Sequence, residues 1–371
     1  MALSPDGSML AYSPNNHIIH IAPVSSSLCT EWNITHTLRG HEQSVSGLRW
    51  ANARRALCSC AHDRTAFVWE YDGVKDAYTQ ILIMVDATIK RGLTSISWSP
   101  SDQKIYIASA SANVGVAKFD AEGYWRCAVA EPHRSAITAL APHPVHNAVV
   151  ATGSTDNFVK FISTYTKSVD GTSSSITAKL GTELYALKLR AWVNAVAWAP
   201  SGTVLAVATH DSSLTVVQGP TADSFADWTA RTISCSLLPF RSLTFVGGDG
   251  GTIVAGGHDF FPVTFVRGTS DSTVWTMGKR GVAASAGGLK KEASAAEMAR
   301  KRFQDAATFG QGSAGGGSDE STRHKNTIVS VLPFPADGVR TRPTSTIPVD
   351  VLFVTASMDG RVELWRDADL A

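Results

Sequence analysis

The chain has 371 residues, of which 44% are hydrophobic and 18% are charged, enough apolar material for one large β domain or two ordinary domains. Lysine and arginine (33) nearly cancel aspartate and glutamate (32), so a net charge of +1 gives no electrostatic reason to expect nucleic acid or an acidic membrane as main partner. No apolar stretch approaches the length of a membrane span, and the N-terminus lacks the apolar segment of a signal peptide.

One sequence unit recurs along the chain. It consists of an apolar strand, a turn, a second apolar strand, an Asx turn and a third strand. A partial copy opens the chain at residues 3–22. Further copies occupy residues 48–69, 96–119, 140–161, 196–217, 243–265 and 351–365.

An Asp or Asn marks the turn before the last strand of each unit. These residues are Asn16, Asp63, Asn113, Asp156, Asp211, Asp259 and Asp359. They recur about every 48 residues, except that the last interval holds about fifty residues more. Seven units therefore span the chain, with an insertion before the last one.

A unit of this size cannot cover both faces of its own sheet. Alternation such as Thr65-Ala66-Phe67-Val68-Trp69 suits strands in a stacked sheet, and "SPDG" and "APSG" are turn sequences. A ring of units leaves no free face, whereas a two-sheet sandwich does not explain the regular period. The sequence predicts an all-β fold, a seven-bladed β-propeller over residues 1–371.

The second unit has the spacing of a WD repeat. Gly40 and His41 precede its first strand, Asp63 and Trp69 follow, and Glu70 replaces the final Asp. His41 is expected to donate to Asp63 near the hydroxyl of Ser59, in a buried network that is structural rather than catalytic. The remaining members expected for this network in other units are Asp156, Asp211, Asp259, Asp359 and Trp365.

The blade pattern stops from Thr269 to Arg323. Glycine- and serine-rich linkers flank a short helix expected over residues 295–307, which a Ser294/Glu297 capping box begins. Such a helix is too short to be stable alone. Either it packs on the propeller rim or stays disordered, or it binds a groove on another protein through apolar anchors and a basic rim. The anchors are Met298 and Phe303, and the rim is Arg300, Lys301 and Arg302.

Three His-Asp pairs raise the question of a metal site. They are His62-Asp63, His210-Asp211 and His258-Asp259. Each pair falls at the same turn of a different unit, which favours turn architecture. The sequence contains no Gly-x-Ser-x-Gly elbow, Walker loop or HExxH motif, so we expect no catalytic residue, metal or cofactor. The five cysteines include no CxxC pair, which is typical of free thiols in a reducing cytosol.

Several stretches resemble one family of WD-repeat proteins, subunit 1 of the actin-related protein 2/3 complex. They are "SPNNHIIHI" (13–21), "HDRTAFVW" (62–69), "GHDFFPVTF" (257–265), "ARKRFQ" (299–304) and "HKNTIVSVL" (324–332). The resemblance implies a non-catalytic scaffold in a complex that nucleates and branches actin filaments. It also implies that the helix near Phe303 engages actin or an actin-related subunit.

The resemblance implies specific partners and a location. The partners are actin-related proteins 2 and 3, the other subunits, the actin filament and nucleation-promoting factors, without nucleic acid or membrane insertion. The location is cytoplasmic, at the actin cytoskeleton. Two alternatives remain open: another WD-repeat adaptor, such as a ubiquitin-ligase substrate receptor or a trafficking scaffold, and a propeller enzyme.

The chain departs from the family pattern at four places. The serine-rich stretch 167–190 is expected to connect the fourth and fifth blades, Pro142 takes a tryptophan position, and residues 340–350 lengthen the last blade. By register, Leu3 matches Trp198, so most of the first strand and any closing strand before it are missing. We expect a truncated gene model; otherwise the C-terminal "RDADLA" must close the ring.

Overall fold

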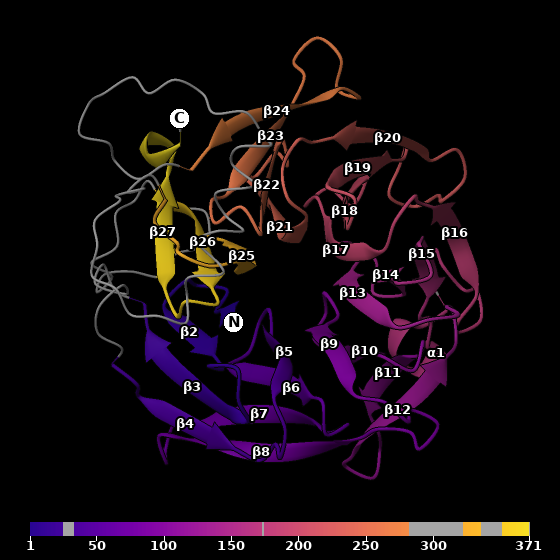
Figure 1. The fold of residues 1–371 in the computed structure, drawn as a ribbon. Helices are drawn as coiled ribbons and strands as arrows, with labels where there is room; N and C mark the ends of the chain where they lie inside the picture. The colour runs from indigo at the N-terminus through magenta and orange to yellow at the C-terminus, as the bar shows by residue number, and fades with distance from the viewer. Residues whose placement is uncertain (25–32, 173, 282–321, 335–350, 371) are drawn as a thin grey trace.

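The fold was analysed in a computed structural model that describes residues 1–24, 33–172, 174–281, 322–334 and 351–370. Within these ranges almost all regular structure is β, with one short helix, α1 (Lys167–Asp170), and one 3₁₀ turn, η1 (Asp367–Asp369). The strands form seven blades, each antiparallel and in chain order, and a short parallel pairing of their outer strands joins blades 2 and 3 into one eight-stranded sheet. Figure 1 shows these blades arranged around a ring.

The strands are assigned to blades as follows. Blade 1 contains β1 (Ala2–Leu3), β2 (Met9–Tyr12), β3 (Ile18–Pro23) and β4 (His36–Arg39). Blade 2 contains β5 (Val45–Trp50), β6 (Ala56–Ala61), β7 (Ala66–Asp72) and β8 (Ala77–Met84). Blade 3 contains β9 (Leu93–Trp98), β10 (Lys104–Ser109), β11 (Val114–Phe119) and β12 (Trp125–Ala130). Blade 4 contains β13 (Ile137–Pro142), β14 (Val149–Ser154), β15 (Phe158–Ser163) and β16 (Glu183–Lys188).

The other three blades complete the ring. Blade 5 contains β17 (Val193–Trp198), β18 (Val204–Thr209), β19 (Ser213–Gln218) and β20 (Thr229–Ser234). Blade 6 contains β21 (Phe240–Val246), β22 (Thr252–Gly257), β23 (Val263–Arg267) and β24 (Trp275–Arg280). In blade 7 the described residues form β25 (Ile328–Pro333), β26 (Val351–Ser357) and β27 (Val362–Arg366). The predicted seven-bladed propeller is confirmed, and the sandwich alternative is excluded.

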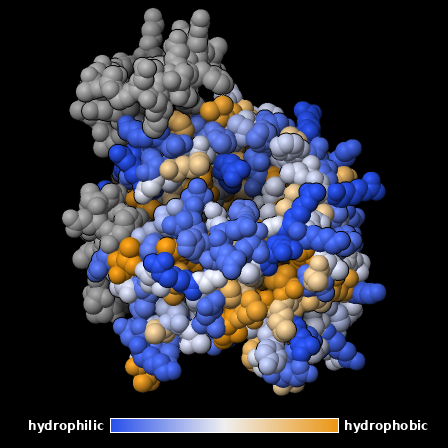
Figure 2. Space-filling model, turned by 60° about the horizontal axis from the view of Figure 1, so that its bottom comes forward, coloured by the Kyte–Doolittle hydropathy of each residue, from blue (hydrophilic) through white to orange (hydrophobic). Residues whose placement is uncertain are grey.

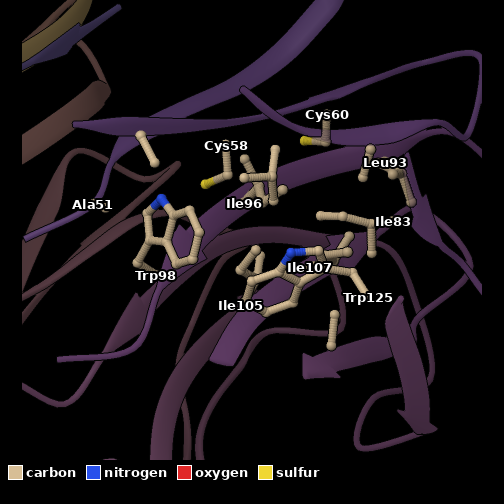
Figure 3. Packing of buried hydrophobic residues seen from close by; sticks show 14 of the residues in the cluster. Ala51, Cys58, Cys60, Ile83, Leu93, Ile96, Trp98, Ile105, Ile107 and Trp125 are labelled. Atoms are coloured by element: carbon tan, nitrogen blue, oxygen red, sulfur yellow. The ribbon is translucent and has the colours of Figure 1, made fainter. Parts of the chain in front are cut away.

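The core consists of apolar layers between neighbouring blades. Second strands such as β6, β10, β14 and β18 are buried at every residue, which explains their nearly continuous apolar sequences. Figure 3 shows the layer between blades 2 and 3, where Trp98 and Trp125 meet at 5.6 Å among Cys58, Ile105 and their neighbours. Burying one such aliphatic side chain stabilises the fold by about 1.5–3 kcal/mol.

Tryptophans at the end of the first strand bond blades 2, 3 and 5 to the blade before them. The indole N–H of Trp98 donates to the carbonyl of Arg49 at 3.2 Å, and that of Trp198 donates to the carbonyl of Ala141 at 3.1 Å. Trp50 donates in the same way to Ala2. Blade 4 has Pro142 at this position, as the sequence indicates, and has no such donor there.

A second ring of bonds lies near the start of the same strands. A bulge at the second residue turns its side chain toward the next blade, where it bonds the carbonyl of that blade's first-strand residue. Ser46 reaches Leu93 at 2.7 Å, and Thr94 reaches Ile137 at 2.7 Å. Thr138 and Asn194 continue the ring to Val193 and Phe240.

Blades 1 and 7 close the ring through apolar packing. Leu10 and Val24 of blade 1 pack with Val351, Val354 and Val362 of blade 7. The first strand is short, as expected, because β1 spans only two residues. The alternative that "RDADLA" closes the ring is not supported, because Leu370 bridges Gly281, which follows β24 in blade 6 (Figure 1).

Two expected boundaries also change. The insertion expected from Thr269 begins later, because β24 pairs with β23 as the outer strand of blade 6. The stretch 167–190 does not connect blades 4 and 5, since its end forms β16, the outer strand of blade 4. The sequence obscures both strands because neither has the continuous apolar run of a buried strand: β24 is mostly exposed, and β16 is half-buried with charged residues at both ends.

The start of the stretch 167–190 is held by a buried ion pair. Lys104 of β10 is fully buried, and its Nζ lies 2.8 Å from Asp170 of α1 and 2.9 Å from the carbonyl oxygen of Thr164. Asp170 also accepts hydrogen bonds from the Asn147 side chain and the Thr166 backbone. This network joins blades 3 and 4 where Pro142 provides no indole donor.

The structure also bears on two expectations from the sequence, the state of the cysteines and the absence of membrane spans. Cys58 and Cys60 are buried free thiols, and Cys127 and Cys235 are half-buried free thiols, whereas Cys29 lies outside the described residues. Over the described ranges, the helices are all too short and polar to cross a bilayer.

Candidate interaction sites

The helix that the sequence singles out lies outside the described residues. Met298, Arg300, Lys301, Arg302 and Phe303 all fall within 282–321, so their roles stay predictions. The structure does describe the second predicted set, the turn network of the WD units. It lies on one face of the ring, here called the Asp-turn face, which carries the turns between the second and third strands of the blades.

In blade 2 the network runs through Thr65. The indole of Trp69 donates to Ser59 at 2.8 Å, and Ser59 lies 2.7 Å from Nε2 of His41. Nδ1 of His41 lies 2.7 Å from the Thr65 hydroxyl, which donates to Asp63 at 2.5 Å. Nδ1 is 3.7 Å from Asp63, so the expected direct hydrogen bond is replaced by one relayed through Thr65.

Asp63 links the turn to the preceding loop. One carboxylate oxygen accepts the backbone N–H of Glu42 at 2.6 Å, and the other accepts that of Thr65 at 2.8 Å. Arg64 between them has a φ of 70°, a left-handed conformation that such side-chain bonds stabilise. The loop before β5 and the turn before β7 are thereby fixed to each other.

Two other histidines occupy the position of His41, and sequence reasoning missed both. His133 bonds Asp156 at 2.9 Å and Thr152 at 2.8 Å. His324 bonds Thr355 at 2.6 Å, which also accepts the indole N–H of Trp365 at 2.7 Å. The signal was present: each histidine stands four residues before the first apolar residue of a first strand, as His41 stands before Val45.

The remaining predicted aspartates also stabilise the turns before third strands, and Asp359 lies 3.9 Å from Nδ1 of His324. Asp259 accepts the backbone N–H of Leu238 at 2.6 Å, and Asp359 accepts that of Lys325 at 2.6 Å. Asp211 bonds residues of its own turn, accepting the hydroxyl of Thr209 at 2.6 Å and the backbone N–H of Ser213 at 3.3 Å.

In blade 3 the turn residue is Ser111 rather than the predicted Asn113. Ser111 accepts the backbone N–H groups of Lys90 and Arg91, and the next residue, Ala112, has a φ of 68°. Asn113 lies two residues further on and bonds Glu131. A hydroxyl substitutes for the carboxylate here, so a search for Asp or Asn finds the wrong residue.

Burial holds these histidines neutral. Desolvation lowers the pKa of His41 to about 4, although Asp63 opposes the shift. The same cause lowers the pKa of His324 to about 4 and depresses the pKa of His133. At neutral pH the rings are therefore hydrogen-bonding elements of the fold.

The described surface offers few features of a small-molecule or metal site. An open cleft of about 430 Å³ between blades 1 and 2 is lined by polar residues including His17, Glu42 and His62. A second open cleft of about 380 Å³ lies on the opposite face beside Arg54 and Arg55. Among the described residues, no three His, Cys, Asp or Glu side chains come together as metal ligands.

Large apolar side chains stand exposed on the Asp-turn face. Trp192, in the loop before β17, is 54% exposed and packs beside the His210 ring at 5.6 Å. Met358, in the turn after β26, is 63% exposed, and Leu238 is 38% exposed. Exposed aromatic and methionine side chains on a rigid frame are typical of protein-binding surfaces.

The comparisons with known proteins match this architecture. A family model described as "WD domain, G-beta repeat" matches residues 32–70, 126–163 and 181–217. Each match covers the outer strand of one blade and the first three strands of the next, so each sequence repeat interlocks two neighbouring blades. The solved structure of RRP9 WD40 repeats gives a TM-score of 0.53 at 20% identity, covering 69% of this chain and 71% of that chain, which supports the fold alone.

Similarity to curated proteins extends over almost the whole chain. Subunit 1B of the actin-related protein 2/3 complex from Arabidopsis thaliana is 28% identical, over 98% of this chain and 92% of that protein. The chain resembles subunit 1 of that complex along its length. Subunit 1A-B from Xenopus laevis has the same identity and coverage. Subunit 1 from Schizosaccharomyces pombe is 28% identical over 90% of this chain and 88% of its own. Relatives of this WD-repeat propeller thus occur in a plant, an animal and a fungus.

Proposed function

We propose that this chain is a non-catalytic scaffold subunit of the actin-related protein 2/3 complex, supporting actin filament nucleation and branching. The observation that carries the proposal is the similarity to proteins named as subunit 1 of that complex, over 98% of the chain. The proposal includes the other subunits, the actin filament and nucleation-promoting factors as partners, and a cytoplasmic location at the actin cytoskeleton.

The site chemistry supports a scaffold rather than an enzyme. The His, Ser, Thr and Asp side chains that superficially resemble catalytic sets are already bonded within the turn network of each blade. His41, for example, is buried between Ser59 and Thr65, with both ring nitrogens in hydrogen bonds. A rigid ring with exposed side chains such as Trp192 and Met358 suits docking of other polypeptides.

Affinity purification of the tagged chain from its own cells tests the proposal. We expect two actin-related proteins to co-purify with it in a stoichiometric assembly under mild salt. We also expect that assembly to accelerate actin polymerisation when a nucleation-promoting factor is added. Absence of both actin-related proteins from the purified material would rule the proposal out and favour another WD-repeat adaptor.

We further propose that the predicted helix at 295–307 contacts actin. The supporting sequence is "ARKRFQ" (299–304), with Phe303 and Met298 as apolar anchors between glycine-rich tethers. Phe303→Ala should weaken filament co-sedimentation of the assembly about tenfold, the scale of losing a buried aromatic anchor. The thermal midpoint of the propeller should stay unchanged.

Phe119→Ala is the matched control for Phe303→Ala. Phe119 lies at the end of β11, on the described rim, and is 54% exposed. This variant should leave filament co-sedimentation as it is in the unmodified assembly. If Phe303→Ala instead unfolds the propeller, the helix belongs to the core and the proposed contact is wrong.

A further inference from the structure

The outer strand of blade 2 differs from the other outer strands of the ring. β8 reads Ala-Tyr-Thr-Gln-Ile-Leu-Ile-Met, with no charged residue, no proline and no break in its pairing with β7. Every other described outer strand carries a charge that protects its edge, and β16 and β24 also carry register shifts. The protecting residues are Arg39, Arg126, Glu183, Lys188, Arg231, Lys279 and Arg280.

The free edge of β8 is long enough to accept another strand. Its last two residues, Ile83 and Met84, pair in parallel with the start of β12. Over the described chain, no strand pairs with the outer edge of Ala77–Leu82, and Figure 1 shows β8 at the periphery of the ring. On a strand edge, every second residue directs its N–H and C=O outward, where only water bonds them.

Exposed apolar side chains stand beside one end of this edge. Leu82 is 54% exposed and Met84 is 49% exposed, and Tyr124 before β12 is 53% exposed. Arg126 is the parallel partner of Met84. Figure 2, in which this rim comes forward, shows hydrophobic side chains gathered on it. An unprotected edge beside exposed apolar side chains is the arrangement used for binding by strand addition.

The basic residues Lys75 and Arg126 at the two ends of the edge are already paired with carboxylates. Lys75 lies 3.4 Å from Asp72 in the hairpin before β8. Arg126 bonds Asp120 at 2.5 Å and also contacts Glu122, at the end where β12 begins. β8 itself therefore offers no charge to a partner, and an uncharged segment loses the least hydration on binding along it.

We propose that the edge of β8 over Ala77–Leu82 is a docking site for an extended, uncharged segment of another polypeptide. The segment adds as a strand in line with β12, bonds the outward backbone groups, and places β-branched or aliphatic side chains against Leu82 and Met84. This inference goes beyond the proposed function, because it holds for whatever assembly the chain joins.

The test compares the isolated chain with the assembly purified on the tagged chain from its own cells. Hydrogen–deuterium exchange should slow on the order of tenfold or more at alternate amides of 77–82 in the assembly. Leu82→Lys and Thr79→Lys, which place a charge at the edge, should each lose one component of that assembly. Both variants should keep the thermal midpoint of the unmodified chain, because both positions are exposed.

Val74→Lys is the matched control. Val74 is 97% exposed in the hairpin beside β8, off the pairing edge, so this variant should keep every component. Unchanged exchange at 77–82, or lysine variants that retain the full assembly, would overturn the docking site. The docking site would also be overturned if the tagged chain purified without any partner, or if it formed a dimer through β8. Slow exchange in an assembly without actin-related proteins would support the docking site and contradict only the proposed function.

Discussion

At the scale of single residues, three histidines perform the same task in blades 2, 4 and 7. His41, His133 and His324 each bond a hydroxyl on the second strand through Nε2. The indoles of Trp69 and Trp365 bond the same hydroxyl in blades 2 and 7. Each ring must stay neutral, because a charge at a fully buried position would lose its hydration without full compensation.

This neutrality predicts a loss of stability in mild acid. The pKa of His41 and His324 is lowered in the folded state to about 4, whereas an unfolded histidine has a pKa of about 6.5. The two neutral rings contribute fully to the stability of the fold above the unfolded pKa. This contribution is lost as the pH falls toward 4, because between the two pKa values the unfolded chain binds more protons than the folded chain. Between pH 7 and pH 5, each should lower the free energy of unfolding by about 2 kcal/mol, measured by urea denaturation.

His41→Gln separates this effect from general acid sensitivity. The variant should be less stable than the unmodified chain at pH 7, because Ser59 loses its ring partner, yet lose less stability between pH 7 and pH 5. His17→Gln, at an exposed position, should leave the pH dependence unchanged. A free energy of unfolding that stays constant or rises from pH 7 to pH 5 contradicts the assignment.

The sequence predicts the residues of this network only where spacing is regular. The pair of His41 and Asp63 was recognisable from the WD spacing. His324 stands 35 positions before Asp359, instead of 22, because the last blade is lengthened between its first two strands. Ser111 was not predicted, because the search looked for Asp or Asn. The turn requires only a side-chain oxygen that accepts hydrogen bonds, and the Ser111 hydroxyl meets this requirement.

At the scale of strands, the bulged first strands join neighbouring blades with side-chain bonds. Thr94→Val removes the hydroxyl that donates to the carbonyl of Ile137 and keeps the side-chain shape. It should lower the free energy of unfolding by about 1 kcal/mol, because that carbonyl loses a hydrogen bond in a partly buried interface. Urea denaturation measures the loss. Thr229→Val on the exposed strand β20 should change it by less than about 0.5 kcal/mol, and an equal effect would contradict the role of the bulge.

The ion pair that holds α1 predicts an asymmetric response to substitution. Lys104→Met leaves the Asp170 carboxylate buried without its cation and should cost about 3 kcal/mol or more in the free energy of unfolding. Adding Asp170→Asn removes the unpaired charge and should restore much of the loss, as a double-mutant cycle would show. Lys118→Met, which loses a bond to the exposed Ser168 on the same helix, should cost little. Additive single effects would show that the two charges do not interact.

Strand prediction succeeded where burial imposes a clear pattern. The second and third strands face apolar layers on both sides, so β6 and β18 could be located from their composition. Outer strands are less buried: β24 is exposed at most residues and β16 is at best half-buried, so their sequences lack the continuous apolar pattern of the inner strands. The ion pair of Lys104 joins residues far apart in sequence, and no local pattern predicts such a contact.

At the scale of the whole molecule, the repeat period determined the number of blades but not how the ring closes. Interfaces such as that between blades 4 and 5 combine an apolar layer with the bonds of Thr138 and Trp198. Blades 1 and 7 meet through the layer around Leu10 and Val354. We expect this apolar layer to carry much of the closure within the part of the chain that the structure describes.

This difference predicts where the ring opens first. Leu10→Ala and Leu205→Ala both remove a fully buried leucine side chain, one between blades 1 and 7 and the other between blades 4 and 5. Each should lower the free energy of unfolding by about 2–5 kcal/mol.

Native-state hydrogen exchange should distinguish the two variants. Leu10→Ala should speed exchange in β2, β3 and β26 below the denaturant range of global unfolding, because the strands there lose their closing contact. Leu205→Ala should speed exchange only with global unfolding, since hydrogen bonds still join its blades. If both variants exchange uniformly, the ring has no preferred opening point, and closure between blades 1 and 7 is as strong as the other interfaces.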